Sequence, residues 1–522
     1  MASKRAGGRA ARRALRAAPL AEKDKAVHPG QLGGRFQPLT ESDMGRIHDA
    51  ILDLLENVGF SRAIPSCIKA VTAAGGKYTD DGRLLFPREL ILKTLDIAAR
   101  DITLYAQHEK HDLHLSGNKV YFGTAGAAVH IVDGWKTHSD YPDAGAYRDS
   151  TLQDLYDAAR LVDKLDHIHF FQRPLVARDI VQPAAMDINT TYASVSGTTK
   201  HVGVSYVEPE HAREALTLLH EIAGSEKKWR ERPFVSMSSC FAVPPLRFAE
   251  DACRVLEVVV HGGMPVLLLA AGQAGATSPA TLAGAVVQEM AEVLAALAYV
   301  NSMVPGHPCV AGPWPFVSDL RTGSMSGGSG EQAILMAACG QMGRYYDLPT
   351  GIAAGMADSK IPDAQSGFEK GYTLALAGHS GANMVYEAAG MQASLLGFSF
   401  EGCTLDNDML GAINRSVRGI EIDDETLALN TIEDVCLNGP EHFLSHESTL
   451  SRMQKDYVYP EVGNRFPPGL WKEMGSLPIN IPARDKAQEI LADHFPRHIN
   501  EELDTRIRSN FDIRLPREQM KP

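Results

Sequence analysis

The residues best suited to chemistry lie in the stretch GMADSKIPDAQSGFEKGY, residues 355–372, where Asp358 and Lys360 follow an apolar, glycine-rich run. Three interpretations are open for this pair. The two side chains form a structural pair in a loop, with Asp358 or Asp363 capping the helix that follows. They line a substrate pocket as catalytic groups, together with Glu387. Or Lys360 is a Schiff-base nucleophile, which requires an apolar pocket that depresses its pKa.

These residues are positioned by a repeat of short apolar strand, polar or glycine-rich loop, and long amphipathic helix. Val, Ile, Leu and Ala fill the strands without alternating with polar residues, as in parallel strands that are buried on both faces. The expected strands are 119–129, 167–174, 200–207, 233–241, 264–272, 308–315, 348–356 and 383–390. Eight such units favour a (β/α)8 TIM-type barrel. A doubly wound open sheet is the alternative, but GTAGAA after the first strand lacks the third glycine of a phosphate loop.

Segments on either side of the barrel complete the expected organisation. The predicted parts are a disordered basic tail (1–35), a helical and loop region (36–118), the barrel (119–400) and a C-terminal helical region packed on the barrel (401–522). A helix is expected to begin after Thr40, which fits a capping box with Asp43, and to end at Gly59. A transit peptide is the alternative for the tail, although the tail is poor in serine.

The composition argues against several partners and locations. A net charge of −13 argues against nucleic acid, because phosphate binding needs clustered basic surface. The longest apolar region, 279–300, contains Gln288, Glu289 and Glu292, so we expect no membrane span. The seven cysteines are scattered and form no C-x-x-C pair. Buried thiols in a reducing cytoplasm explain them most simply, so a cytoplasmic protein is expected.

Two groups of histidines have spacings that deserve a test for metal binding. His108, His111 and His114 lie in polar sequence ahead of the first strand, where a solvated turn is the simpler interpretation. His442 and His446 are four residues apart, but the segment lacks the H-E-x-x-H pattern of zinc enzymes. We therefore expect no metal site.

In a barrel of this kind, the active site lies at the carboxyl ends of the strands. The residues that follow the expected strands include many aromatic side chains and few ionisable ones. The aromatic residues are Phe171, Tyr206, Trp314, Phe316 and Tyr386, and the ionisable residues are Asp358, Lys360 and Glu387. The sequence thus predicts an aromatic mouth with a small number of charged groups.

The most specific segments of the chain come from the last three barrel units and the region after them. They read AGPWPFVSDLRTGSMSGGSGEQAILMAACGQMGRYYDLPTGIAAGMADSKIPDAQSGFEKGYTLALAGHSGANMVYEAAG, then SVRGIEIDDETLALNTIEDV and HFLSHESTL. These segments resemble the trimethylamine methyltransferase family of corrinoid-dependent methyltransferases, and the resemblance extends over roughly residues 35–500. It implies a (β/α)8 barrel and an enzyme that moves a methyl group from an amine to a Co(I) corrinoid. Because no further domain for a cobamide is found here, the corrinoid is expected on a separate protein that docks at the barrel mouth.

The resemblance also bears on the substrate. Archetypal family members demethylate trimethylamine and carry pyrrolysine in the mouth, and the surrounding motif places that position at or very near Lys360. Members without pyrrolysine are associated with quaternary amines such as glycine betaine. A quaternary ammonium already carries its charge and leaves as a neutral amine, so it needs only to be held, oriented and desolvated. The resemblance therefore implies a quaternary amine rather than trimethylamine.

A quaternary ammonium cannot donate a hydrogen bond, so aromatic faces recognise it, at about 2 kcal/mol or more when desolvated. Trp314, Phe316 and Tyr386 are the cage candidates, with Phe171 and Tyr206 behind them; core packing is the alternative for each. Asp358 or Glu387 would offer negative charge.

If the substrate also carries a carboxylate, Arg321 could clamp it with both guanidinium nitrogens. A surface pair with Asp319 is the other interpretation of Arg321.

Two other functions stay open. One is a Schiff-base lyase or aldolase that uses Lys360 on the same barrel, and the other is a non-catalytic betaine-binding protein. Barrels of this size often associate, so a homo-oligomer is compatible with the sequence.

Overall fold

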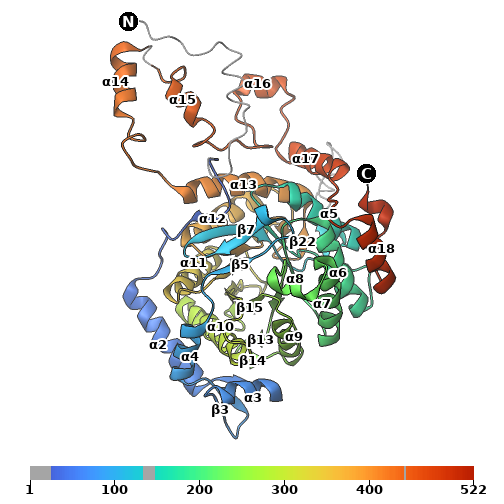
Figure 1. The fold of residues 1–522 in the computed structure, drawn as a ribbon. Helices are drawn as coiled ribbons and strands as arrows, with labels where there is room; N and C mark the ends of the chain where they lie inside the picture. Colours follow the sequence, from blue (N-terminus) through green and yellow to red (C-terminus); the bar gives the residue numbers. More distant parts are fainter. Residues whose placement is uncertain (1–24, 133–146, 440–441, 522) are drawn as a thin grey trace.

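The computed structural model describes residues 25–132, 147–439 and 442–521. Parallel strands form a sheet that closes into a barrel (Figure 1). In their order around the barrel, the strands are β7 (Lys119–Thr124), β10 (Phe170–Gln172), β11 (His201–Val204), β12 (Val235–Ser239), β15 (Val266–Ala270), β17 (Cys309–Pro313), β19 (Gly351–Ala353) and β20 (Met384–Tyr386). A parallel bridge between Ala311 and Thr350 joins β17 to β19 and completes the circle. The predicted (β/α)8 barrel is confirmed, and every strand lies inside an expected segment.

A long helix follows each barrel strand and packs on the outside of the sheet. These helices are α5 (Leu152–Lys164), α6 (Pro183–Gly197), α7 (Pro209–Ala223), α9 (Glu250–His261), α10 (Leu282–Met303), α11 (Gly330–Tyr345), α12 (Ala364–Ser380) and α13 (Phe400–Arg418), with a short α8 (Glu226–Glu231) after α7. Local signals set their ends: Thr151 and Asp154 form a capping box at the start of α5, and α12 ends at the left-handed Gly381.

Helix α10 is long and apolar enough to cross a membrane, but most of it is buried among the other elements, as in the core helix of a barrel. Its two acids, Glu289 and Glu292, are both fully buried. The charged residues that argue against a membrane span in the sequence are therefore part of the protein core.

Large side chains fill the inside of the barrel where neighbouring strands carry glycine. The ring of Tyr386 lies over Gly351, where a Cβ atom would come within 2.6 Å of the ring carbon Cε2. Tyr386 also meets the ring of Phe170 edge-on, with 5.0 Å between centroids. Tyr386 belongs to β20 and Phe170 to β10, the two strands on either side of β7. Their rings meet across β7, on the inner face of the sheet, so both point into the barrel.

The region before the barrel contains helices and several short strands. The predicted helix is α2 (Glu41–Asn57), with the expected capping box of Thr40 and Asp43. It is followed by α3 (Pro65–Ala73), α4 (Arg88–Ile97) and a turn of 3-10 helix at Glu109–His111. The short strands are β1 (Gln31–Leu32), β2 (Phe60–Ser61), β3 (Lys77–Tyr78), β4 (Arg83–Leu85), β5 (Ile102–Leu104) and β6 (Leu113–Leu115). They are too short for a readable alternation, which is why the sequence did not predict them.

Loops at the carboxyl ends of the barrel strands add further short pairs. They are β8 (His130–Val132), β9 (Tyr147–Asp149), β13 (Ala242–Val243), β14 (Arg247–Phe248), β16 (Gln273–Ala274), β18 (Phe316–Val317), β21 (Met391–Gln392) and β22 (Gly397–Phe398). Of these, β13 and β14 extend the small sheet of β2, β3 and β4. The N-terminal region therefore braces the loop that follows β12.

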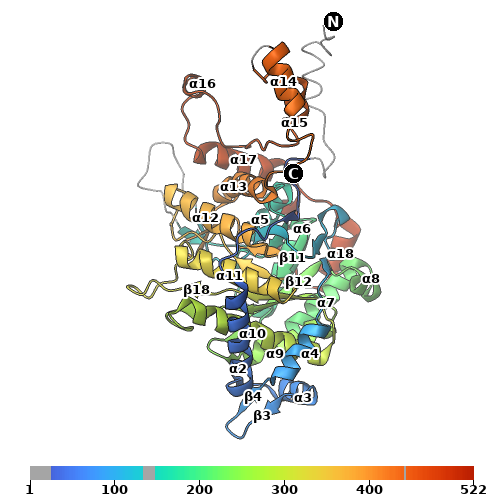
Figure 2. The same ribbon diagram turned by 90° about the vertical axis from the view of Figure 1, so that its left-hand side faces the viewer.

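The chain after α13 leaves the barrel and returns. Helices α14 (Leu429–Asn438), α15 (Glu447–Arg452) and α16 (Pro468–Glu473) project away from the barrel body (Figure 2). Helix α17 (Asn480–Asp493) then packs on α13, and α18 (Glu501–Asn510) and a 3-10 turn (Arg517–Met520) end the described chain. Most of the predicted basic tail, residues 1–24, lies outside the described residues, and the predicted boundaries between parts stay predictions.

Candidate functional site

Glu387 is the most unusual ionisable residue at the barrel mouth. It comes directly after β20 with φ of +63°, a left-handed conformation that costs a non-glycine residue about 1 to 2 kcal/mol. Its side chain is buried, and Oε2 has no hydrogen-bond partner among the described residues. Burial raises the pKa of this carboxyl to about 8. A strained, buried and unpartnered carboxyl at a strand end is typical of a functional group rather than of packing.

Arg173 and Cys240 meet the same space from other strands. Arg173 follows β10 and Cys240 follows β12. The pKa of the Cys240 thiol is raised by burial and by the Glu387 carboxyl, and the Arg173 guanidinium opposes this shift. Burial also lowers the pKa of Arg173, whose Nε lacks a partner among the described residues. The Cys240 side chain is nevertheless exposed to solvent.

Three of the predicted aromatic side chains lie together. The ring centroid of Trp314 is 5.3 Å from that of Tyr386 and 6.3 Å from that of Phe316. Trp314 and Tyr386 are almost completely buried, and the Trp314 indole N–H donates to the carbonyl of Gly351 at 3.1 Å. Phe316 is half-buried in β18, above them. The three rings form a wall from the barrel interior to its rim, which we call the aromatic wall.

The other two aromatic candidates lie elsewhere. Phe170 points into the barrel, and successive side chains of a strand alternate between faces, so Phe171 points outward to the helix layer. Tyr206 follows β11 and is buried, with its hydroxyl 3.5 Å from the Thr191 hydroxyl of α6. Burial raises its pKa strongly. Tyr206 thus stays near the strand ends, whereas Phe171 does not reach the mouth.

Asp358 fastens three loops of the mouth to one another. Its carboxylate accepts hydrogen bonds from the Ser326 hydroxyl at 2.6 Å, the Gly327 N–H at 2.7 Å and the Ser394 hydroxyl at 2.5 Å. These partners follow β17 and β20, whereas Asp358 itself follows β19. Its own N–H donates to Glu369 of α12 at 2.7 Å. The contacts match the structural interpretation of this residue.

Lys360 and Arg321 lie on the outside of the same loops. The Lys360 side chain is exposed, and its ammonium donates to the carbonyl of Asp358 at 2.6 Å. This environment is not the apolar pocket that a Schiff-base lysine requires. The Arg321 side chain is 88% exposed and holds both oxygens of Asp319, at 3.0 and 2.7 Å. The surface-pair interpretation of Arg321 therefore describes its contacts.

A buried pair of acids supports the mouth from behind. Glu289 accepts the N–H of Gly272 at 2.7 Å, and Glu292 accepts the N–H of Leu246 at 2.9 Å. Each carboxyl has a second oxygen without a partner among the described residues. Burial raises the pKa of Glu292 to about 7, and burial together with Glu292 raises that of Glu289 well above its ordinary range. These carboxyls hold the loops after β15 and β12.

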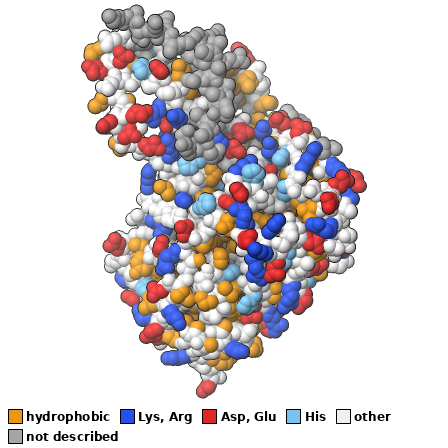
Figure 3. Space-filling view, viewed as in Figure 1, with side chains coloured by type: hydrophobic (Ala, Val, Ile, Leu, Met, Phe, Trp, Pro, Cys, Tyr) orange, Lys and Arg blue, Asp and Glu red, His pale blue; other side chains and the backbone are white. Residues whose placement is uncertain are grey.

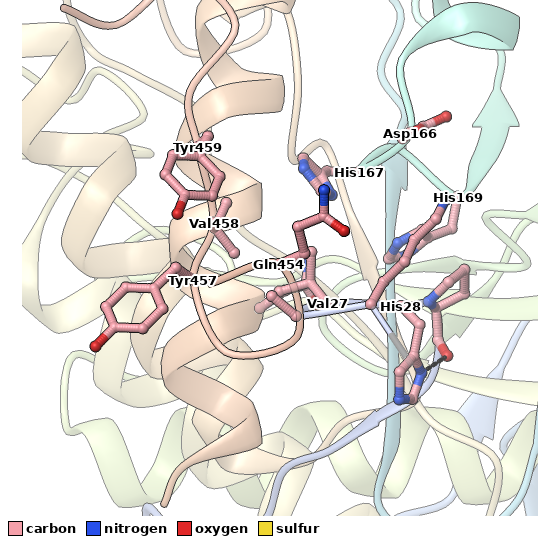
Figure 4. Close-up of a pocket in the computed structure, with 13 residues that line it drawn as sticks. Val27, His28, Asp166, His167, His169, Gln454, Tyr457, Val458 and Tyr459 are labelled. Carbon is pink, nitrogen blue, oxygen red and sulfur yellow. Dashed lines mark hydrogen bonds between the residues drawn. The ribbon is translucent and has the colours of Figure 1, made fainter. Parts of the chain in front are cut away.

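A separate cavity of about 220 Å³ lies at the opposite end of the barrel, at the start of β10 (Figure 4). His28, His167 and His169 line it, with Gln454 and Tyr457 from the C-terminal region. Nδ1 of His169 accepts the N–H of Phe122 at 3.0 Å. Across residues 25–132, 147–439 and 442–521, no group of three His, Cys, Asp or Glu side chains is arranged to hold a metal ion.

Sequence reasoning missed Arg173 and the buried acid pair. Arg173 lies inside the expected strand 167–174, but the observed strand β10 ends one residue before it, at Gln172. A lone cation at a strand end is the available signal. In the sequence, Glu289 and Glu292 indicate only that the apolar region 279–300 carries charge. Two acids three residues apart on a helix without any other charge are a signal for buried carboxyls.

Comparison with known proteins identifies the family. Residues 5–518 match the trimethylamine methyltransferase (MTTB) family. The trimethylamine methyltransferase MttB2 of Methanosarcina mazei is 31% identical over 472 residues, which cover 88% of this chain and 92% of that protein. The glycine betaine methyltransferase of Desulfitobacterium hafniense is 27% identical over 480 residues, covering 92% of this chain and 97% of that protein.

Among solved structures, a dihydropteroate synthase from Xanthomonas albilineans aligns with a TM-score of 0.36 at 12% identity, covering 61% of this chain and all of that one. A score this low adds nothing to the argument. The sequence match spans nearly the whole chain and includes the strands that carry Glu387, Arg173 and the aromatic wall. The chain therefore belongs to the trimethylamine methyltransferase family, and it is a methyltransferase that acts on methylated amines.

Proposed function

We propose that this enzyme transfers a methyl group from a quaternary amine that also carries a carboxylate, of the glycine betaine type, to the Co(I) corrinoid of a separate protein. One observation supports this substrate class above others. Glu387 and Arg173 place one potential negative and one positive charge at the mouth, and each acts electrostatically on the thiol of Cys240. A betaine is a zwitterion, so it matches such a pair of opposite charges. The 27% identical relative is named a glycine betaine methyltransferase.

Each side chain has a defined part in this proposal. The Glu387 carboxylate balances the ammonium, and the aromatic wall of Trp314, Phe316 and Tyr386 offers ring faces to the N-methyl groups. Arg173 takes the carboxylate, the part first considered for Arg321, because Arg321 is already paired with Asp319 on the surface. Tyr206 stays a candidate for the rim beside Arg173.

The loop residues act indirectly in this proposal. Asp358 holds the three loops that carry the aromatic wall and Glu387, so it is a positioning residue. Lys360 occupies the outer side of this loop, at or near the position where family members carry pyrrolysine. Its exposure supports no Schiff base, and the proposal assigns it no bond to the substrate.

The reaction moves one methyl group between two partners. The C–N bond breaks, its electron pair stays on nitrogen, and the quaternary ammonium leaves as a neutral tertiary amine. When its carrier protein is docked, the corrinoid supplies the low-valent cobalt that accepts the methyl group. The chain itself has to bind the amine, exclude water and aim one N-methyl group out of the mouth. The proposed carrier is therefore a cytoplasmic corrinoid protein that reaches the mouth.

The decisive test is calorimetric binding of glycine betaine, choline and trimethylamine to the full chain and to two arginine variants. We expect glycine betaine to bind and Arg173→Met to weaken it about 10- to 100-fold, since a charged hydrogen bond is worth about 1.5 to 3 kcal/mol. Choline, which lacks the carboxylate, should respond little to this change. Arg321→Met is the matched control and should leave both affinities unchanged.

Two results would overturn the proposal. If trimethylamine binds and no quaternary amine does, the substrate class is wrong. If Arg173→Met weakens choline as much as glycine betaine, Arg173 does not recognise a carboxylate. Trapping of a substrate on Lys360 by borohydride would instead establish the lyase alternative.

A further inference from the structure

The cavity of about 220 Å³ at the start of β10 takes no part in the proposed methyl transfer, because it lies at the end of the barrel opposite the mouth. Its walls come from segments far apart in the sequence: residues 25–29, the turn before β10, Asn414 of α13, and residues 454–459. Gln454 belongs to the last segment, and its amide points toward the rings of His167 and His169 (Figure 4). The cavity is therefore formed by the folded chain as a whole.

His169 presents a hydrogen-bond donor to this cavity. Its Nδ1 accepts the N–H of Phe122 at 3.0 Å, and a ring nitrogen that accepts carries no proton. Burial lowers the pKa of His169 well below its ordinary value, so the ring is neutral at pH 7. In a neutral ring with a bare Nδ1, the proton is on Nε2. This Nε2–H has no partner among the described residues, and it is free to donate to a ligand.

Asn414 presents an acceptor to the same cavity. Its side chain is 1% exposed, and its Nδ2 donates to the carbonyl of Leu410 at 2.9 Å. That carbonyl can only accept, which fixes the orientation of the amide. The other atom of the amide, Oδ1, has no partner among the described residues. A buried acceptor without a partner costs stability, so a ligand that donates to Oδ1 gains from this contact.

The charges around the cavity are balanced. Burial lowers the pKa of His167. Asp166 and Asp408 act on this ring in the opposite direction, and Lys200 and Lys25 add to the lowering. Two carboxylates and two ammonium groups therefore surround the ring. On the face seen in Figure 3, Lys and Arg side chains are mixed with Asp and Glu where the C-terminal lobe joins the barrel. Such surroundings select neither an anion nor a cation.

An uncharged amide matches these features. Its carbonyl oxygen accepts from His169, and its N–H donates to Asn414. A carboxylate has no hydrogen to give to Asn414 Oδ1, and an ammonium has no lone pair for the His169 N–H. An apolar cavity of about 150 Å³ holds benzene, so about 220 Å³ holds a single ring with a small substituent.

We propose that this cavity is a second binding site of the enzyme, which takes a small uncharged amide between the Nε2–H of His169 and the Oδ1 of Asn414. Only the three residues of β10 separate His169 from Arg173, so the ligand touches the strand that positions Arg173 at the mouth. The inference depends neither on the identity of the methylated amine nor on the roles proposed for residues of the mouth.

The test is calorimetric binding of benzamide to the full chain, with benzoate as the matched compound. The two share the ring and the planar substituent, but benzoate is charged and has no N–H. We expect benzamide to bind at one site with a dissociation constant of about 1 mM or below, measured with up to about 10 mM of the compound. Benzoate should bind at least about 10-fold more weakly, because a carboxylate oxygen then faces Asn414 Oδ1.

Asn414→Leu removes the acceptor and keeps a side chain of similar size. It should weaken benzamide at least about 10-fold, without lowering the melting temperature, since the unpartnered buried oxygen is gone.

Asn301→Leu is the matched control. Asn301 is also buried in a helix, and its Nδ2 donates to the carbonyl of Leu297, four residues earlier, at 2.9 Å. Its Oδ1, however, accepts the N–H of Gly306 at 2.9 Å. Asn301→Leu should therefore lower the melting temperature and leave the affinity for benzamide unchanged.

Several outcomes would overturn the proposal. The site does not exist if the wild type shows no binding up to about 10 mM, a range that includes millimolar dissociation constants. The ligand class is wrong if benzoate binds as tightly as benzamide. An affinity that is unchanged in Asn414→Leu but lost in Trp314→Phe places benzamide at the mouth.

A crystal structure of the wild type soaked with benzamide decides the question even if Asn414→Leu fails to fold. We expect the benzamide oxygen within about 3.2 Å of His169 Nε2, and its nitrogen equally close to Asn414 Oδ1. Benzamide found only elsewhere in the molecule would refute the assignment.

Discussion

The raised pKa of Glu387 makes amine binding depend on pH in a way that can be calculated. With a pKa of about 8, the carboxyl is largely protonated at neutral pH in the free enzyme. The ionised fraction is about one tenth at pH 7 and about one hundredth at pH 6. A quaternary ammonium beside it favours the carboxylate, so binding has to release the proton first. The dissociation constant should therefore fall about tenfold per pH unit from pH 6 to pH 8 and level off above that.

The measurement is calorimetry with glycine betaine across this range, in two buffers of different ionisation enthalpy. At pH 7 we expect nearly one proton to be released per bound amine, from the ionised fraction of about one tenth. Glu387→Gln should abolish both the pH dependence and the proton release. Burial raises the pKa of the Cys240 thiol from its ordinary value of 9.0, so this thiol does not account for a pH dependence between pH 6 and pH 8.

Glu292 is the necessary control, because its pKa of about 7 lies in the same window. Glu292→Gln should keep the pH dependence of binding. A dissociation constant that is flat between pH 6 and pH 8, or a slope that persists in Glu387→Gln and disappears in Glu292→Gln, would refute the assignment of the ammonium site to Glu387.

Three further outcomes follow from the buried groups. The pKa of Glu292 is raised from 4.5 to about 7, so the wild type loses stability as the pH rises from 4.5 to 7. Above pH 7, Glu292→Gln should therefore be more stable than the wild type by on the order of 3 kcal/mol in urea unfolding. An equal difference at pH 4 would contradict this origin. Lys370→Met should destabilise by about 3 to 5 kcal/mol, because it leaves Asp406 buried without its partner at 2.7 Å, whereas the double change Lys370→Met/Asp406→Leu should recover part of the loss. Trp314→Ala should lower the free energy of unfolding by roughly 3 to 5 kcal/mol, because the side chain is almost completely buried. A Trp314→Ala protein as stable as the wild type would show that the aromatic wall is loosely packed. Trp314→Phe, which keeps a ring, is the variant for binding studies.

The barrel was predictable because its strands are continuous apolar runs, each followed by a helix with its own cap, and these signals are local. The position of individual side chains was harder to predict from the sequence. Phe171 and Phe170 are adjacent aromatics, and only the pairing of β10 with β7 and β11 decides which one points inward. Arg173 lies inside the expected strand 167–174 but just after the observed β10, because the end of a strand cannot be placed to one residue from apolar content.

Environment was harder still to predict than position. Glu387 and Lys360 both follow barrel strands, but one is buried and the other exposed. The difference arises from how neighbouring loops close over each residue, which no short segment specifies. Arg321 illustrates the opposite case: its partner Asp319 is two residues away, so its surface pair could be anticipated from the sequence, and the structure places it there.

The three hydrogen bonds of Asp358 have a consequence for changing this enzyme's substrate. Since one carboxylate fastens the loops after β17, β19 and β20, no single loop can be replaced by that of a relative without unfastening the other two. The three loops on this side of the mouth should therefore change together when the substrate range changes. Chimeras that exchange the loops together with Ser326, Asp358 and Ser394 should retain activity, whereas exchanges of one loop at a time should not.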